Sequence, residues 1–272
     1  MSLTVLGSTA PVLQHASTAI GRFVRARAAF LLMLAALSWG VLREARRPRS
    51  WRRTVRMEFR RALRQAVGGG LATTLVTAAL TGLALVAQAL YWLGLAGQGE
   101  LEGSLLVTVL VRELTPLLTG MVLLGLSGTV TVTELGHLRL GGQMRILAAQ
   151  GLDPFLLLVM PRTLAFALTS FALGVFFVLA ALVMGFVANS LLGAVRESLW
   201  MFFDHVLSSM RAVDFVVFPV KMLCIGALVA LTACLTGLTA RPGEDIATLL
   251  PRGFVRGVLA IMLASLVFSL AA

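Results

Sequence analysis

The sequence predicts an all-α integral membrane protein, and three observations support this class. Of the 272 residues, 58% are apolar and only 13% are charged, whereas soluble domains carry roughly a quarter charged residues. Long uncharged stretches recur along the chain, and a helix needs about 20 apolar residues to cross the hydrocarbon core. The positive charge is confined to one end, because residues 1–64 hold thirteen arginines and two acidic residues and so account for the whole net charge of +11.

The remainder of the chain is electrically neutral, with ten basic and ten acidic residues in 65–272. A neutral apolar body with a basic head argues against nucleic-acid binding and against a collagenous, disordered or disulfide-stapled class. Cys224 and Cys234 are ten positions apart in one apolar run. That separation is about 15 Å along a helix, beyond disulfide reach. The three histidines are isolated, so we predict no metal site.

The uncharged runs, extended through their few internal charges, predict five transmembrane helices. Several exceed 25 residues, so tilt or extension beyond the bilayer is expected. A shorter apolar stretch at 28–42 is flanked by arginines. We interpret it as an interfacial or re-entrant helix, with a cleaved signal peptide as the alternative. The five expected spans are about 66–94, 105–137, 155–190, 214–240 and 252–271.

The arginines also predict the orientation of these spans. Sixteen basic residues lie in the basic head and in the loops at 138–153 and 241–251, against two in the loops at 95–104 and 191–213. Basic loops face the cytoplasm. We therefore expect a cytoplasmic N-terminus and, after five crossings, a periplasmic C-terminus.

Two amphipathic segments complete the expected layout. Residues 51–63 place apolar side chains at every fourth position among arginines, a pattern typical of a helix on an anionic leaflet. Residues 196–211 carry a second apolar stripe at helical spacing, which we expect outside the membrane, on the bilayer or against a partner. We divide the chain into a basic segment at 1–65 and a membrane domain at 66–272.

Three of the charges inside the expected membrane spans are the informative ones. Charges at the bilayer centre cost roughly 2.5–3.5 kcal/mol on insertion scales, so Arg112, Glu113 and Lys221 need partners or water. Glu113 and Lys221 have opposite charge and similar expected depth below the outer surface. They are therefore a candidate ion pair or two walls of one wet cavity. Glu134 is expected at the inner end of its span, where solvation alone explains it.

The loop RLGGQMRILAAQGLDP predicts a short cytoplasmic helix at about 139–153, with a first turn weakened by Gly141 and Gly142. Such a helix is either an ordinary connector or the place where a transporter receives force from an ATPase. The chain itself has no GxxxxGK[ST] phosphate loop, since Lys221 is its only lysine.

Residues 110–162 carry an ordered series of motifs that resembles the MlaE-type permease family, the membrane subunits of ABC lipid transporters that work with MCE-domain proteins. Asp214, Lys221 and Arg252 resemble further family positions near the starts of the last two spans. The resemblance covers about 66–272. The motifs are Arg112-Glu113-Leu114-Thr115-Pro116, Glu134-Leu135-Gly136, Arg139, Gln143, Gly151, Asp153-Pro154 and Pro161-Arg162.

The resemblance implies a homodimeric permease in a bacterial inner membrane that moves phospholipid or a related amphipathic lipid between inner and outer membranes. A separate ABC ATPase subunit would bind ATP and magnesium, and an MCE-domain periplasmic protein would be a further partner. Neither a cofactor nor catalysis is expected in this chain. We assign Arg112, Glu113 and Lys221 to the substrate path, and Arg139, Gln143, Arg145 and Asp153 to coupling with the ATPase. The remaining motif residues are assigned structural roles: Pro116, Gly125, Gly128, Glu134, Gly136, Pro154, Pro161 and Arg162.

Three departures from the family pattern keep alternatives open. Leu126 replaces an arginine, Gly141-Gly142 replaces a Thr-Glu pair of the coupling helix, and RPGEDIATLLP replaces a glycine-rich segment. One alternative is therefore a membrane scaffold that has lost ATP coupling. An ion-coupled carrier with Glu113 and Lys221 as a proton relay is a weaker alternative, because no inverted repeat is evident.

Overall fold

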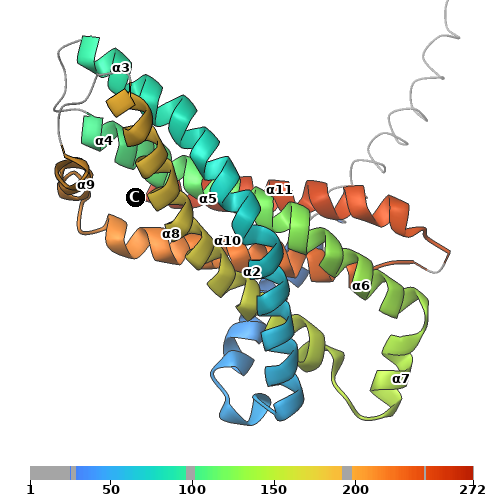
Figure 1. The fold of residues 1–272 in the computed structure, drawn as a ribbon. Coiled ribbons are helices and arrows are strands. Elements are labelled where there is room, and N and C mark those ends of the chain that lie inside the picture. Colours follow the sequence, from blue (N-terminus) through green and yellow to red (C-terminus); the bar gives the residue numbers. More distant parts are fainter. Residues whose placement is uncertain (1–24, 26–28, 96–101, 192–197, 242, 272) are drawn as a thin grey trace, which may run out of the picture.

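The computed structural model describes residue 25 and residues 29–95, 102–191, 198–241 and 243–271, and these contain helices and connections but no strand. Residues 29–45 form a first helix, followed by the short 3-10 turn η1 (Pro48–Ser50). Figure 1 shows the helices that follow. They are α2 (Arg53–Thr81), η2 (Gly82–Val86), α3 (Ala87–Leu95), α4 (Glu102–Leu106), η4 (Val107–Leu114), α5 (Thr115–Leu123), η5 (Leu124–Gly128), α6 (Thr129–Leu140), α7 (Gln143–Ala149), η6 (Phe155–Val159), α8 (Met160–Leu191), α9 (Leu199–Ser208), α10 (Asp214–Leu238) and α11 (Ile246–Ala271).

The prediction of five membrane spans is confirmed. Five continuous helical runs are long and apolar enough to cross a bilayer: Arg53–Ala89, Ser104–Leu140, Phe155–Ala188, Asp214–Leu238 and Ile246–Leu270. Three of them contain π-helical turns, namely η2, η4 with η5, and η6. Such turns are common at functional sites, and the hydrophobic pattern gave no sign of them.

The expected separate surface helix at 51–63 is wrong. Its residues form the first turns of α2, which continues into the first span without a break. The buried positions Val55, Ala62, Ala66 and Gly70 keep helical spacing across the change in composition. Residues 53–81 contain no proline that would interrupt the backbone hydrogen bonds. The proposed division at residue 65 stays a prediction, and α2 runs straight across it.

The helix at 29–45 agrees with the interfacial or re-entrant segment expected at 28–42, of which residue 28 lies outside the described residues. Val41 is buried in a cluster with residues of α6, α7 and η6. Most large apolar side chains of this helix face outward, as a membrane-embedded surface requires. Leu32 and Trp39, for example, are 71% and 69% exposed.

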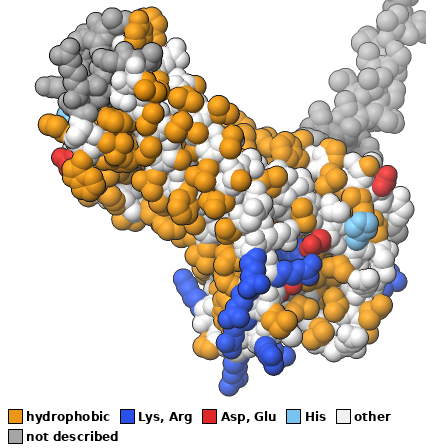
Figure 2. Space-filling view, in the orientation of Figure 1, with side chains coloured by type: hydrophobic (Ala, Val, Ile, Leu, Met, Phe, Trp, Pro, Cys, Tyr) orange, Lys and Arg blue, Asp and Glu red, His pale blue; other side chains and the backbone are white. Residues whose placement is uncertain are grey.

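The helix ends gather at two ends of the molecule (Figure 1). One, called the proximal end below, holds the arginine-rich start of α2, α7 and the connection between α10 and α11. The other, the distal end, holds α9, the start of α10 and the end of α11. Figure 2 shows Lys and Arg side chains gathered near the start of α2, while the rest of the visible face is largely apolar.

Helix α10 is the centre of the bundle. It packs against α8, α11, α6 and α5, and most of its side chains are buried. Close approach to α8 requires glycine at position 226, because a Cβ there would collide with the carbonyl oxygen of Phe166. Gly82 plays the same part between η2 and α8, where a Cβ would collide with the carbonyl oxygen of Ala181.

The expected helix at about 139–153 is shorter than predicted. Helix α6 continues to Leu140, and α7 covers only Gln143–Ala149. Gly142 has a φ of 71°, in the left-handed region that glycine adopts without strain, so the glycine pair forms a turn between two helices. The second helix predicted outside the membrane, at 196–211, corresponds to α9, and residues 196 and 197 lie outside the described residues.

Candidate functional site

Two charged clusters mark the two ends of the bundle. The distal charge cluster comprises Arg112, Glu113, Asp214 and Lys221, and the proximal ion network comprises Glu58, Arg61, Glu134 and Arg162. Each contains two cations and two carboxylates, so each is formally neutral.

The distal charge cluster confirms the expected pairing of Glu113 with Lys221. Lys221 Nζ lies 3.7 Å from Glu113 Oε1, and the lysine side chain is only 4% exposed. Ser265 Oγ of α11 donates a hydrogen bond of 3.3 Å to the other Glu113 oxygen. The pair therefore joins η4 to α10 and α11.

Lys221 also donates a hydrogen bond to a backbone carbonyl group that would otherwise lack its helical partner. Pro116 has no N–H, so it cannot donate to the carbonyl oxygen of Arg112 four residues earlier. Lys221 Nζ donates to that oxygen over 2.5 Å. Thr115, the residue before Pro116, donates from Oγ1 to the Leu110 carbonyl oxygen over 2.8 Å, within the π-helical turn. Side chains thus satisfy carbonyl groups in the stretch that carries the charges.

Arg112 is held by a partner that was not assigned from the sequence. Its Nη2 lies 2.7 and 2.8 Å from the two carboxylate oxygens of Asp214, whose side chain is 4% exposed. The Arg211 backbone N–H donates to the same carboxylate over 2.9 Å. Arg112 Nε, by contrast, is buried and has no hydrogen-bond partner among the described residues. The guanidinium is therefore positioned by Asp214, and its Nε is a buried donor without a hydrogen-bond partner among these residues.

These groups line a pocket of about 260 Å³ at the distal end. One wall is charged and comes from η4 and α10, while Val111, Val217, Phe218 and Phe268 supply apolar surface. Glu113 is 37% exposed and Arg112 23%, so the two residues on η4 are the charged groups that a ligand can reach. A polar wall facing an apolar wall suits an amphipathic molecule.

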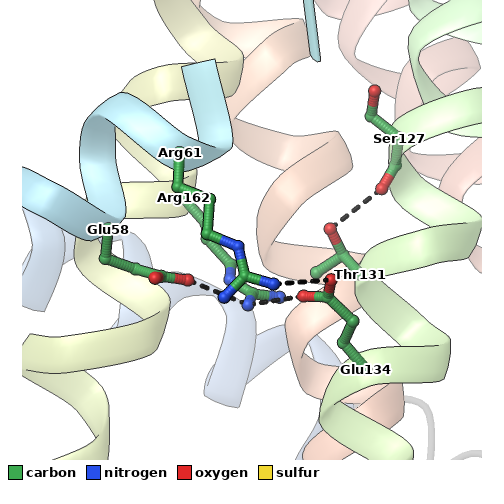
Figure 3. A network of polar contacts seen from close by, with 6 residues as sticks. All are labelled: Glu58, Arg61, Ser127, Thr131, Glu134 and Arg162. Carbon is green, nitrogen blue, oxygen red and sulfur yellow. Dashed lines mark hydrogen bonds and ion pairs between the residues drawn. The ribbon is translucent and has the colours of Figure 1, made fainter. Parts of the chain in front are cut away.

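The proximal ion network joins three helices through Arg162 (Figure 3). The Nη2 atom of this α8 residue lies 3.0 Å from Glu58 Oε1 on α2 and 2.7 Å from Glu134 Oε2 on α6, and its side chain is 6% exposed. Arg61 reaches Glu134 from the solvent side at 3.7 Å. Glu134 is thus a member of a buried network, and solvation of a helix end does not account for it.

A second pocket, of about 370 Å³, opens beside this network. Glu58, Glu134 and Arg162 line it together with His137 and with Gln143, the first residue of α7. The network therefore lies next to the short helix between the second and third spans.

Comparison with known proteins identifies the family. Residues 59–271 match the family described as Permease MlaE. The chain belongs to the MlaE permease family. It is therefore the membrane permease component of a transporter.

Three relatives of this MlaE-family permease are similar over most of the chain. A protein of Synechocystis sp. named Probable ABC transporter permease protein is 28% identical over 73% of this chain and 75% of its own length. Protein TRIGALACTOSYLDIACYLGLYCEROL 1, chloroplastic, of Arabidopsis thaliana is 26% identical over 79% of this chain, which spans only 62% of that protein. A further Probable ABC transporter permease protein, from Porphyra purpurea, is 26% identical over 64% of this chain and 66% of its own length.

The four residues assigned to coupling in this MlaE-family permease are not brought together. Arg139 lies in the last turn of α6 and Arg145 lies on α7, both exposed, and Gln143 lines the proximal pocket. Asp153 instead caps the helix that follows, since its Oδ1 accepts the Phe155 N–H over 2.9 Å. Their coupling role stays a prediction.

The residues assigned structural roles lie mostly at helix contacts. Gly128 and Gly136 are buried against Leu124 and Leu249, whereas a Cβ on Gly125 would meet open space. Pro154 precedes η6, and Pro161 is buried beside Arg162.

Two charged residues that make polar contacts between helices were not predicted from the sequence. Glu58 was grouped with a basic surface helix, although its expected level matches the inner ends of the second and third spans. Arg256 lies in the last span, where its guanidinium is 4.6 Å from the centre of the Phe30 ring and 3.5 Å from Thr236 Oγ1. Arg256 lies ten residues after the start of α11, so its position in the sequence could have identified it as a charge inside the membrane.

Proposed function

We propose that this chain is the membrane-embedded permease subunit of an ABC transporter that moves phospholipid or a related amphipathic lipid between the inner and outer membranes. The observation that carries the proposal is the distal pocket, where Arg112 and Glu113 face apolar walls. The partly exposed Arg112 guanidinium suits a headgroup oxygen, and the apolar wall suits an acyl chain. ATP hydrolysis, with its magnesium, belongs to a separate ATPase subunit.

The orientation that we propose follows the arginines. The proximal end faces the cytoplasm of a bacterial inner membrane, so α7 and its exposed Arg145 and Ile146 are available to the ATPase. The distal end faces the periplasm, where α9 exposes Trp200 and Met201 toward the bilayer or an MCE-domain partner. Two copies of the chain form the permease.

A pair of neighbouring substitutions tests the pocket. Val217 lines the pocket, whereas Val216, one position earlier on α10, is 65% exposed and lies outside it. Val217→Trp should fill the cavity and abolish lipid-stimulated ATP hydrolysis and lipid transfer by the reconstituted complex. Val216→Trp should retain both activities. Equal activity of the two variants would contradict transport through this pocket.

The partners are tested by purification in mild detergent. The tagged chain should bring down a Walker-type ATPase and an MCE-domain protein, both identified by mass spectrometry. Recovery of the permease with neither partner would overturn the proposal.

A scaffold without ATP coupling is the second candidate, and the Gly141-Gly142 turn favours it because the acidic contact expected in the coupling helix is missing. Robust lipid-stimulated ATP hydrolysis by the native complex would rule the scaffold out. Basal hydrolysis that ignores added lipid would favour it.

A further inference from the structure

A third pocket, of about 750 Å³, lies at the proximal end between η1, the start of α2 and the residues that lead into α8. We call it the elbow pocket, because the chain bends here from the helix at 29–45 into the first span. Its polar side includes Arg47, Arg49 and Arg52, and its apolar side includes Leu152, Leu156 and Leu157.

The two carboxylates that line the elbow pocket are already engaged. Glu44 accepts hydrogen bonds from Ser50 Oγ over 2.6 Å and from Arg47 Nη1 over 2.8 Å. The Ser50 hydrogen bond and the nearby arginines lower the pKa of Glu44, so it remains charged and paired. Asp153 caps the helix that begins at Phe155.

Arg49 and Arg52, by contrast, have no carboxylate partner within the described part of the chain. Both are exposed, and Arg46, Arg53 and Arg56 add positive charge around them. An arginine pair of this kind suits the oxygens of a phosphate group, which guanidinium groups bind bidentately.

The apolar side of the pocket restricts the source of that phosphate. Leu156 and Leu157 belong to the first turns of the third span, and Arg52 directly precedes the first span. The pocket therefore lies at the proximal ends of two helices that are long and apolar enough to cross a membrane. A soluble phosphate makes no use of the leucine wall, whereas a lipid places its phosphate on the arginines and an acyl chain along the leucines.

We propose that the elbow pocket is a binding site for one anionic phospholipid of the leaflet at the proximal end, with the phosphate on Arg49 and Arg52 and an acyl chain against Leu156 and Leu157. This lipid is separate from any cargo in the distal pocket. It joins the helix at 29–45 and the base of α2 to the membrane surface, so the site makes the elbow sensitive to anionic lipid. The proposal does not depend on the transported substrate.

Native mass spectrometry of the full chain in detergent, titrated with phosphatidylglycerol, tests the site without the ATPase. The Arg49→Gln/Arg52→Gln variant should bind phosphatidylglycerol at least tenfold more weakly than the parent chain. Arg60→Gln/Arg64→Gln is the matched control, because it removes the same charge from exposed positions of α2 outside the pocket. The control should bind within twofold of the parent.

Further arms separate the possible sources of binding. Phosphatidylcholine should bind at least tenfold more weakly than phosphatidylglycerol, and millimolar inorganic phosphate should not displace the lipid. Equal weakening in both double variants would mean general attraction to basic charge and would overturn the site. Displacement by inorganic phosphate, or equal binding of phosphatidylcholine, would overturn the lipid assignment.

A charge-preserving variant distinguishes the loss of a lipid contact from misfolding of the chain. Arg49→Lys/Arg52→Lys keeps both charges but loses the guanidinium geometry, so its affinity should fall between the parent and the glutamine variant. If the lysine variant bound phosphatidylglycerol as tightly as the parent chain, positive charge alone would explain binding. That result would contradict bidentate binding of the phosphate by the two arginines.

Discussion

The two charged clusters of this permease contain the same numbers of cations and carboxylates but use them differently. At the proximal end one buried arginine, Arg162, is shared by carboxylates from two other helices, and the exposed Arg61 only closes the network from outside. At the distal end two ion pairs lie side by side. Their buried members, Asp214 and Lys221, are on α10, and their exposed members, Arg112 and Glu113, are on η4. The first arrangement holds helices together, and the second presents charge to a cavity.

The largest effect should come from removing the shared arginine. Arg162→Ala removes the buried guanidinium that Glu58 and Glu134 share and leaves the two carboxylates facing each other, and breaking a buried pair in this way costs about 3–5 kcal/mol. Thermal unfolding in detergent should show a large drop. Arg61→Ala is the matched control, since this arginine is 67% exposed and should contribute less than about 1 kcal/mol. If the two variants lost equal stability, Arg162 would hold the helices together no more than the exposed Arg61 does.

The second effect concerns the buried distal pair. Arg112→Ala leaves the Asp214 carboxylate buried with only the Arg211 N–H as a partner, which should cost about 3 kcal/mol. Adding Asp214→Asn should restore part of the lost stability, because the remaining side chain is neutral. Stability and lipid-stimulated ATP hydrolysis should be measured together. A double variant no more stable than Arg112→Ala would contradict this explanation.

A smaller effect is expected at the accessible distal pair. Lys221→Met leaves Glu113 unpaired and the Arg112 carbonyl unsatisfied, but Glu113 is 37% exposed and can be hydrated, so the cost should be about 1–2 kcal/mol. Glu113→Gln/Lys221→Met should be less destabilised than Lys221→Met alone. Additive losses in the complete double-mutant cycle would show that the two residues do not interact.

An effect no larger than that at Lys221 should arise in the turn before α7. Gly142→Ala forces a left-handed conformation on a residue with a Cβ, at a cost of about 1–2 kcal/mol. Gly68→Ala in α2 is the control, because its Cβ meets nothing within 4 Å and alanine favours a helix by about 0.5–1 kcal/mol. The two changes should therefore shift the unfolding midpoint in opposite directions. A shift in the same direction would contradict the assigned turn geometry.

Much of the fold could be predicted from the sequence. The length of each apolar stretch and the positions of the charges can be read along the chain without knowing how the helices pack. The five spans and the helix at 29–45 needed no knowledge of packing. The continuity of α2 was missed because a change from basic to apolar composition looks like a boundary, although the backbone hydrogen bonds do not respond to it. The π-helical turns have no compositional signature.

The site was predictable only in part for a related reason. Depth along a span suggested the Glu113–Lys221 pair. The Arg112–Asp214 and Glu58–Arg162 pairs depend on how each helix is rotated about its axis, and packing alone fixes that rotation. Asp214 and Lys221 are seven residues apart, two turns along one helix face, so the shared face was visible but its neighbour was not.

The unbroken helix from Arg53 to Leu95 has a mechanical consequence. It is about 60 Å long, and Gly82 brings it against α8 at a close contact roughly two thirds of the way along. The Glu58–Arg162 ion pair holds the same helix against α8 near its arginine-rich base, so α2 and η2 are fixed to α8 at two widely separated levels. A force applied to the base near Arg52 would therefore act on both helices together.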